Sequence, residues 1–210
     1  MTFREFLNER NFYVSESKSG GKIIPKDKDE LKELVEDEKV HLGDIEIPKH
    51  ITDFSNLFTD SQRKDFSGIE KWNVSNVTDM SGMFHEARNF NANISKWNVS
   101  KVEDMSQMFH GADNFNQPIG KWNVSRVKNM SYMFFDARKF NQPLNDWNVS
   151  NVTMMSQMFY RAQNFNQPLD KWNVSKVKHA GQMFYLTKVS KENISKWKMS
   201  DEMKEKLGIF

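Results

Sequence analysis

Two histidines and two unbroken columns of polar residues are the groups in this sequence with the means to do chemistry. His85 and His110 stand 25 residues apart in equivalent surroundings, with Glu86 beside the first. Imidazole and carboxylate are ligands that zinc accepts, but a zinc site normally needs three protein ligands. The same slot continues as Phe135 and then as tyrosine, which cannot complete the set. We therefore interpret the histidines as part of an exposed aromatic edge and predict no metal site and no cofactor.

Serine recurs every 25 residues from Ser75 to Ser200, and asparagine does so from Asn73 to Asn173. A serine becomes a nucleophile only beside a base, and no histidine or acid recurs next to this column. We predict turn or capping hydroxyls for the serines, a hydrogen-bonding ladder for the asparagines, and no catalytic residue. The Asn-Val-Ser triplets match the glycosylation acceptor pattern, but the repeat accounts for them without glycans.

Composition narrows the class of protein further. The chain has 210 residues, a formal charge of +2 and no cysteine, which excludes disulfides, thiol catalysis and cysteine-bound zinc. Hydrophobic residues make up 38% of the sequence, enough for a packed core. No apolar run approaches the roughly 18 residues of a membrane span, and no signal-peptide core follows the first residues. On this ground alone we would expect a cytoplasmic protein.

The elements that position these columns follow from a repeat. All tryptophans are spaced by 25 residues, and a fixed period of this kind marks an array of stacked units. The shared pattern is I/L-x-x-W-N-V-S-x-V-x-x-M-S-x-M-F-x-x-A-x-x-F-N-Q-P. Nine of the 13 methionines fall in its two Met slots, so we interpret them as core filling. The tryptophans are Trp72, Trp97, Trp122, Trp147, Trp172 and Trp197.

Each copy changes its apolar spacing along its length. Trp97 and Val99 are two residues apart, as in a short strand, whereas the apolar positions from Val102 to Ala112 have the three-to-four spacing of a short helix. One strand and one helical turn cannot bury so many apolar side chains alone, but stacked copies can.

Three segments follow from this reading. Residues 1–50 form an N-terminal capping segment with a helix at 29–38 and a strand at 41–47, after a loop at 15–21. Residues 51–199 hold six copies, and residues 200–210 form a capping helix with Met203, Leu207 and Phe210 turned inward. Atypical terminal copies and polar caps are what the ends of such arrays require.

The repeat pattern resembles leucine-rich repeats, in particular the BspA-type repeats of bacterial surface proteins, whose copies carry W-[DN]-V-S-x-V-x-x-M-x-x-M-F. The resemblance covers about residues 51–197. It implies an α/β repeat solenoid, leucine-rich-repeat-like, with a parallel β-sheet on one face and short helical turns on the other. It also implies adhesion or protein binding by a secreted or surface-displayed protein, in contrast to the cytoplasmic expectation above.

The predicted function is that of a non-enzymatic module that binds a macromolecule, most simply a protein. Trp and Val of each strand point inward, so the residues before and between them point outward. Residues 1–46 carry 8 basic and 12 acidic side chains, whereas the remainder carries 22 and 16, which makes the repeats basic. The aromatic residues occupy core slots, which argues against a nucleic-acid platform. The predicted binding residues are Lys96, Asn98, Lys121, Asn123, Asp146, Asn148, Lys171 and Asn173.

Two other classes of function remain open. One is a structural protein that assembles end to end through weak caps. The other is a hydrolase with a site in residues 1–50, although the sequence shows no nucleophile and base at a spacing that would support it. The oligomeric state and the identity of the partner stay open at this point.

Overall fold

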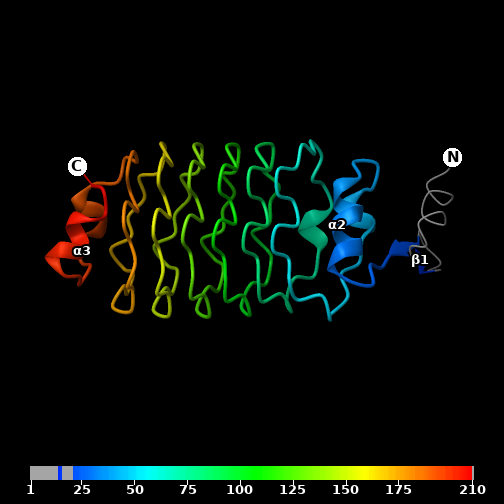
Figure 1. Ribbon diagram of the computed structural model, residues 1–210, viewed down its shortest axis with the longest axis horizontal. Coiled ribbons are helices and arrows are strands. Elements are labelled where there is room, and N and C mark those ends of the chain that lie inside the picture. Colours follow the sequence, from blue (N-terminus) through cyan, green and yellow to red (C-terminus); the bar gives the residue numbers. More distant parts are fainter. Residues whose placement is uncertain (1–13, 16–20, 210) are drawn as a thin grey trace.

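The computed structural model describes residues 14–15 and 21–209 of the chain. It is an elongated stack of irregular turns with a short helix toward each end (Figure 1). We call each 25-residue turn of the stack a coil. The regular elements are β1 (Val14–Ser15), β2 (Lys22–Ile23), α2 (Lys28–Glu36), the 3₁₀ helices η1 (Leu42–Asp44), η2 (Ile69–Lys71) and η3 (Lys191–Ile194), and α3 (Asp201–Glu205).

The predicted α/β solenoid with a parallel sheet along one face is wrong. The described residues form only short helices, and the described coils are joined by isolated one-residue parallel bridges instead of strands. The bridges lie at the slot of Asp79 and Asp104, outside the Trp-x-Val segment that was predicted to form the sheet. The two-stranded sheet that the structure does contain is antiparallel, pairing Val14 with Ile23 and Ser15 with Lys22.

The described Trp-x-Val segments form no strand pairs, and their tryptophan rings stack from coil to coil instead. The indoles of Trp147 and Trp172 are 6.4 Å apart, and those of Trp172 and Trp197 are 6.0 Å apart. The indole N–H groups link these layers, since Trp122 donates to the Ile94 carbonyl of the preceding coil at 3.2 Å. Four other tryptophans repeat this bond, namely Trp97, Trp147, Trp172 and Trp197, whereas Trp72 donates to the Leu42 carbonyl in η1.

The predicted helical turns are likewise absent from the Met-rich half of the described coils. Alternate amides from Met80 to Glu86 donate to the next coil, for example Phe84 N–H to the Met108 carbonyl at 2.9 Å. Between them, the amides of Met83 and His85 close tight turns onto the third residue before, Met80 and Gly82. Two residues per coil adopt the left-handed backbone region, which a right-handed helix does not contain. In successive coils these pairs are Asn56 and Asp60, Gly82 and Glu86, Gln107 and Gly111, Tyr132 and Asp136, Gln157 and Arg161, and Gln182 and Leu186.

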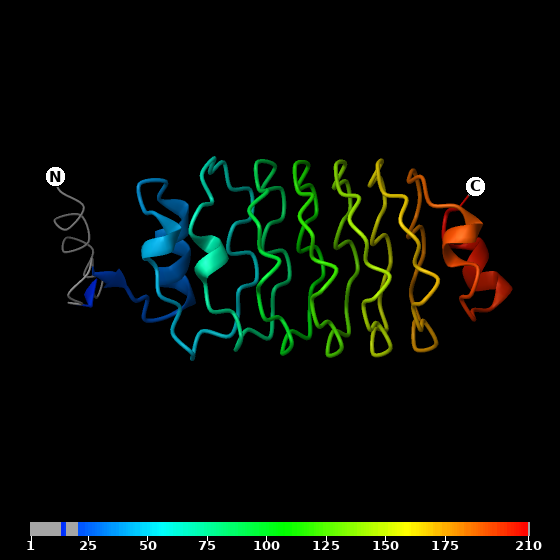
Figure 2. The ribbon, with the colours of Figure 1, turned by 180° about the vertical axis from the view of Figure 1, so that it is seen from behind.

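The core columns follow the repeat as the sequence predicts. All six tryptophans are at most 5% exposed, and both phenylalanine columns are buried. Phe109 and Phe115 stack within one coil at 3.9 Å between ring centroids, and Phe109 and Phe134 stack between coils at 5.6 Å. Apolar contact is therefore continuous along the stack, which is seen from behind in Figure 2.

The N-terminal helix differs slightly from its predicted bounds. Asp27 caps α2 by accepting from the Glu30 amide at 2.9 Å, and Leu31, Leu34 and Val35 are buried against the first coil. The strand predicted at 41–47 is wrong, because this segment contains the 3₁₀ helix η1 and pairs only through an isolated bridge between Ile23 and Ile45. The loop predicted at 15–21 lies mostly outside the described residues.

The C-terminal helix is shorter than predicted and buries none of its own residues. Ser200 caps α3 by accepting from the Met203 amide at 3.2 Å. Leu207, just beyond the helix, is fully buried, and its carbonyl accepts from the Phe184 amide at 2.8 Å. Met203 is only partly buried, and Phe210 lies outside the described residues.

Candidate binding face

The structure exposes all eight residues that the sequence selects for binding. From Trp72 to Trp172, each coil presents a charged residue just before its buried tryptophan and an asparagine just after it, and the following valine is buried again. Hydrogen bonds between coils bring the equivalent residues into rows. We call this surface the lysine–asparagine face; it consists of Lys96, Asn98, Lys121, Asn123, Asp146, Asn148, Lys171 and Asn173.

The asparagines of this face shape its turns and do not form the predicted ladder. The side-chain oxygen of Asn98 accepts from the Ser100 amide at 3.2 Å, and the other coils repeat this Asx turn. The serines thus lie in turns, as predicted, but from Ser100 to Ser175 it is the backbone N–H that makes the turn bond, and the predicted capping hydroxyl is seen at Ser200 of α3. Since the carboxamide oxygen holds the turn, the amide group of each exposed asparagine is presented to solvent in a fixed direction.

The charged residues of the face divide into a paired and an unpaired group. Lys171 contacts Asp146 of the preceding coil at 2.8 Å, and this hydrogen bond raises the pKa of Lys171. Lys96 and Lys121 make no ion pair with any described residue. A hollow of about 350 Å³ beside Lys171 and Asn173 is also lined by Lys196. The unpaired charge of the face is therefore positive.

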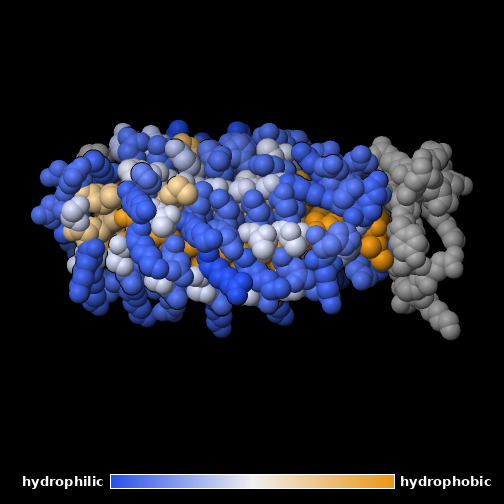
Figure 3. All heavy atoms as spheres, turned by 60° about the horizontal axis from the view of Figure 1, so that its bottom comes forward, coloured by the Kyte–Doolittle hydropathy of each residue, from blue (hydrophilic) through white to orange (hydrophobic). Residues whose placement is uncertain are grey.

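A second basic row lies next to the face, after the Asn-Val-Ser turn. Lys101 donates to the side-chain oxygen of Asn76 at 2.7 Å, and Lys176 makes the same bond to Asn151. Both acceptors are neutral, so these contacts position the ammonium groups without cancelling their charge. Figure 3 shows one side of the stack covered by hydrophilic side chains over most of its length.

The histidine pair belongs to a stacked aromatic column. The rings of His85 and His110 are 4.5 Å apart, and His110 lies 4.5 Å from Phe135. Burial and the neighbouring His85 lower the pKa of His110, although Glu86 opposes this shift. The Nδ1 atoms of both histidines are buried without a hydrogen-bond partner. Within the described residues, no three His, Asp or Glu side chains are placed to hold a metal ion.

A ladder of side-chain amides does exist in the fold, at a place that the sequence pattern did not lead us to expect. It runs through the Phe-Asn-Gln-Pro turns, where Asn91 accepts from the Asn116 amide at 3.0 Å and from the Gln117 side chain at 3.0 Å. The next two coils repeat these bonds. The recurring Asn-Gln pair before proline was the available signal. These hydrogen bonds hold the turns of neighbouring coils together just before the chain enters the lysine–asparagine face.

The described part of the chain contains no helix whose length and apolar character would let it cross a bilayer. Residues 52–155 and 121–207 match the family model described as "Mycoplasma protein of unknown function, DUF285". Together these overlapping stretches cover well over half of the 210 residues. No curated protein and no solved structure matches the chain. The coils thus carry the family's pattern, and the chain belongs to the family described as Mycoplasma protein of unknown function, DUF285.

Proposed function

We propose that this protein is a non-enzymatic module that binds another protein through its lysine–asparagine face. The observation that carries the proposal is the rigid register of this face, in which exposed side chains repeat once per coil above buried tryptophans. Repeating side chains on a stacked backbone form one extended surface, and such surfaces are used for recognition.

The charges of the face favour an acidic partner. Lys96 and Lys121 are exposed and make no ion pair with a described residue, while Lys101 and Lys176 in the next row contact only neutral oxygens. A partner carboxylate could therefore approach without displacing an internal ion pair. The asparagine amide groups add hydrogen-bond donors at a fixed spacing, which suits acceptors on the same partner.

The resemblance to BspA-type repeats supports binding or adhesion as the class of function. That support concerns the sequence pattern of the coils and extends to no particular partner or cellular location. The hydrolase alternative would place its site in residues 1–50, and no described residue in that segment favours it.

The proposal is tested by reversing charge on the face and, separately, at exposed lysines elsewhere on the stack. One variant carries Lys96→Glu, Lys121→Glu and Lys171→Glu. The matched control carries Lys64→Glu, Lys139→Glu and Lys188→Glu, which changes the net charge equally at exposed lysines outside the face. Each protein is immobilised and exposed to the same protein extract, and the bound proteins are identified by mass spectrometry.

We expect a partner that the wild type and the control variant retain and the face variant loses. Raising the salt concentration to about 0.5 M should weaken that capture, because the Debye length then falls well below 10 Å. Equal loss from both variants, or no loss from either, would show that the lysine–asparagine face is not the binding surface.

A further inference from the structure

Exposed apolar surface gathers at the C-terminal end of the stack. Leu186 is 54% exposed, the most exposed large apolar side chain among the described residues. Five apolar side chains pack only partly buried against the core, and four of them belong to the last two coils or follow them: Val177, Met199, Met203 and Ile209. Apolar atoms are visible at this end in Figure 3, on the side away from the grey atoms. Concentrated apolar surface of this kind marks an interaction site.

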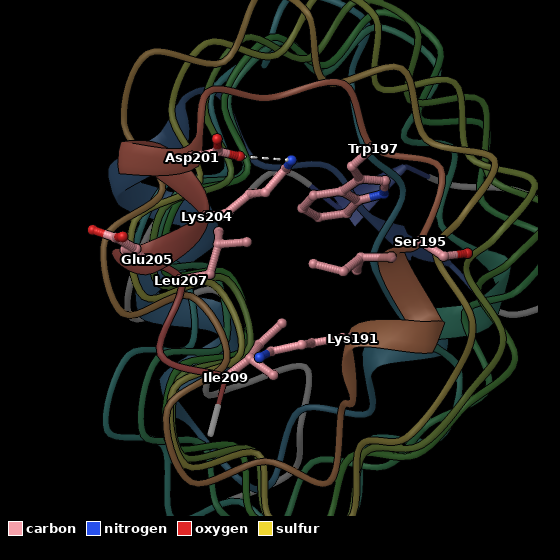
Figure 4. A pocket seen from close by; sticks show the side chains of 9 residues that line it. Lys191, Ser195, Trp197, Asp201, Lys204, Glu205, Leu207 and Ile209 are labelled. Carbon is pink, nitrogen blue, oxygen red and sulfur yellow. Dashed lines mark hydrogen bonds and ion pairs between the residues drawn. The ribbon is translucent and has the colours of Figure 1, made fainter.

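The same end is hollow. A cavity of about 600 Å³ opens there, and Figure 4 shows Trp197 and Leu207 facing each other across it from opposite sides of the last layer. Ile194 and Ile209 add to its apolar lining. The hollow persists because α3 is only five residues long and buries none of its side chains. The last apolar layer is therefore covered less completely than the layers inside the stack.

The helix near the other end behaves differently. α2 buries Leu31, Leu34 and Val35 against the first coil and presents charged side chains, such as Glu33, on its outer side. A head-to-tail contact would set the apolar C-terminal end against this charged helix. A contact between two C-terminal ends would instead cover apolar surface with apolar surface.

The charges around the cavity suit such a contact with an identical copy. Lys204 already pairs with Asp201 at 3.2 Å. Lys191 and Glu205, which also line the cavity, are exposed and make no ion pair with a described residue. One unpaired positive and one unpaired negative rim charge make the rim self-complementary. In a two-fold contact, each copy's Lys191 can meet the other copy's Glu205, so both pairs form at once.

Some backbone groups of the last coil lack the hydrogen-bond partners that their equivalents have in earlier coils. The Arg161 amide donates to the Tyr185 carbonyl, but the equivalent amide of Leu186 has no backbone acceptor among the described residues. The Thr153 carbonyl accepts from the Lys178 amide, but the Lys178 carbonyl accepts from no backbone amide of a described residue. The end layer thus offers both a donor and an acceptor to an incoming chain. We infer that a second copy of this chain docks on this surface and forms a two-fold dimer through the C-terminal ends.

The oligomeric state of the full chain tests this inference directly. Analytical ultracentrifugation should show the mass moving from 24.8 kDa toward twice that value as concentration rises, with no larger species. Leu186→Glu places a carboxylate on both sides of the interface and should abolish the dimer. Met154→Glu is the matched control. Met154 is the other large apolar side chain exposed among the described residues, at 38%, and it lies in a coil away from the C-terminal end.

A charge swap checks the two-fold arrangement independently. Lys191→Glu and Glu205→Lys should each weaken the dimer at least severalfold, and the double variant should restore it, because both residues occupy the same interface. Circular dichroism of each variant checks that the fold is kept. A monomeric wild type at all concentrations, growth beyond a dimer, or a dimer that survives Leu186→Glu would overturn the inference. Loss of the dimer in Met154→Glu, or no rescue by the double variant, would do so as well.

Discussion

In the Met-rich half of the coils, several non-glycine residues adopt the left-handed backbone conformation, which lowers the stability of the folded chain. Ten described non-glycine residues have φ between 54° and 61°, a region that costs an L-residue roughly 1–2 kcal/mol. Gly82 and Gly111 occupy equivalent slots without this penalty. The repeat therefore tolerates strain that packing and ladder bonds offset, and glycine is the residue that relieves it.

We expect Gln107→Gly to raise the free energy of unfolding by about 1 kcal/mol. Gln107 has φ 58° and an exposed side chain with no hydrogen bond to a described residue, while Gly82 holds the same slot one coil earlier at φ 60°. Glycine removes the left-handed penalty, although its freer unfolded chain reduces the gain. Urea denaturation measures the change. Gln107→Ala keeps a Cβ and should give no gain; an equal gain from alanine would contradict this explanation.

The half-buried His110 should make stability depend on pH. Burial lowers the pKa of His110 in the folded chain, whereas the unfolded chain keeps a value near 6.5. The unfolded state therefore binds more protons, so stability should fall as pH drops through about 6.5 and level off below the lowered pKa. His110→Phe, which copies Phe135 in the next coil, should flatten this dependence in thermal melts. Replacing the exposed His179 with glutamine should leave the pH dependence of stability unchanged. A flattened pH dependence in the His179 variant would show that His110 is not its source.

At the scale of elements, one arginine ties α2 to the first coil. Arg63 is only 4% exposed, and its guanidinium donates to the carbonyls of Val35 at 3.2 Å and Val40 at 3.0 Å, and also to that of Asp37. These carbonyls lie in the last turn of α2 and just beyond it, where a helix leaves acceptors unsatisfied. The guanidinium thus completes the end of the helix and holds it against the stack.

We expect Arg63→Met to destabilise the protein by about 3 kcal/mol, because several buried carbonyls lose their donors together. Hydrogen exchange should show the loss of protection first in α2. Arg88→Met removes an exposed arginine that contacts Glu86 at 3.0 Å, and such surface pairs contribute less than about 1 kcal/mol. Equal losses from the two substitutions would show that Arg63 has no special role in holding α2.

The elements also show where sequence reasoning succeeds and where it stops. The Trp97–Val99 alternation correctly predicted which side chains are buried, but alternation does not determine which backbone segments pair, and the bridges between coils form at the slot of Asp79 and Asp104 instead. Apolar spacing from Val102 onward is satisfied equally by a helix and by successive tight turns; only the sign of φ at Gln107 and Gly111 separates them. The exposure of the lysine–asparagine face followed from the same alternation, whereas the partners of Arg63 lie 23 to 28 residues away and carry no local signal.

At the scale of the whole molecule, coils contact chiefly their immediate neighbours. We expect Trp122→Ala, in the middle of the stack, to cost roughly 3–5 kcal/mol, because it leaves a cavity and removes the bond to Ile94. The two halves should also uncouple, so the denaturant dependence of unfolding should become shallower. The exposed neighbour Lys121→Ala is the control and should change stability by less than about 0.5 kcal/mol. An unchanged midpoint for Trp122→Ala would contradict a continuous core.

The bonds that link each coil only to the next have a mechanical consequence. A force that pulls the two ends of the stack apart acts along the hydrogen bonds between coils, so the layers can separate one at a time. Each coil occupies about 5 Å of the stack but holds 25 residues, which extend to roughly 85 Å once released. We therefore expect a stack under load to lengthen in steps of roughly 80 Å for each coil released, while the coils still stacked keep their shape.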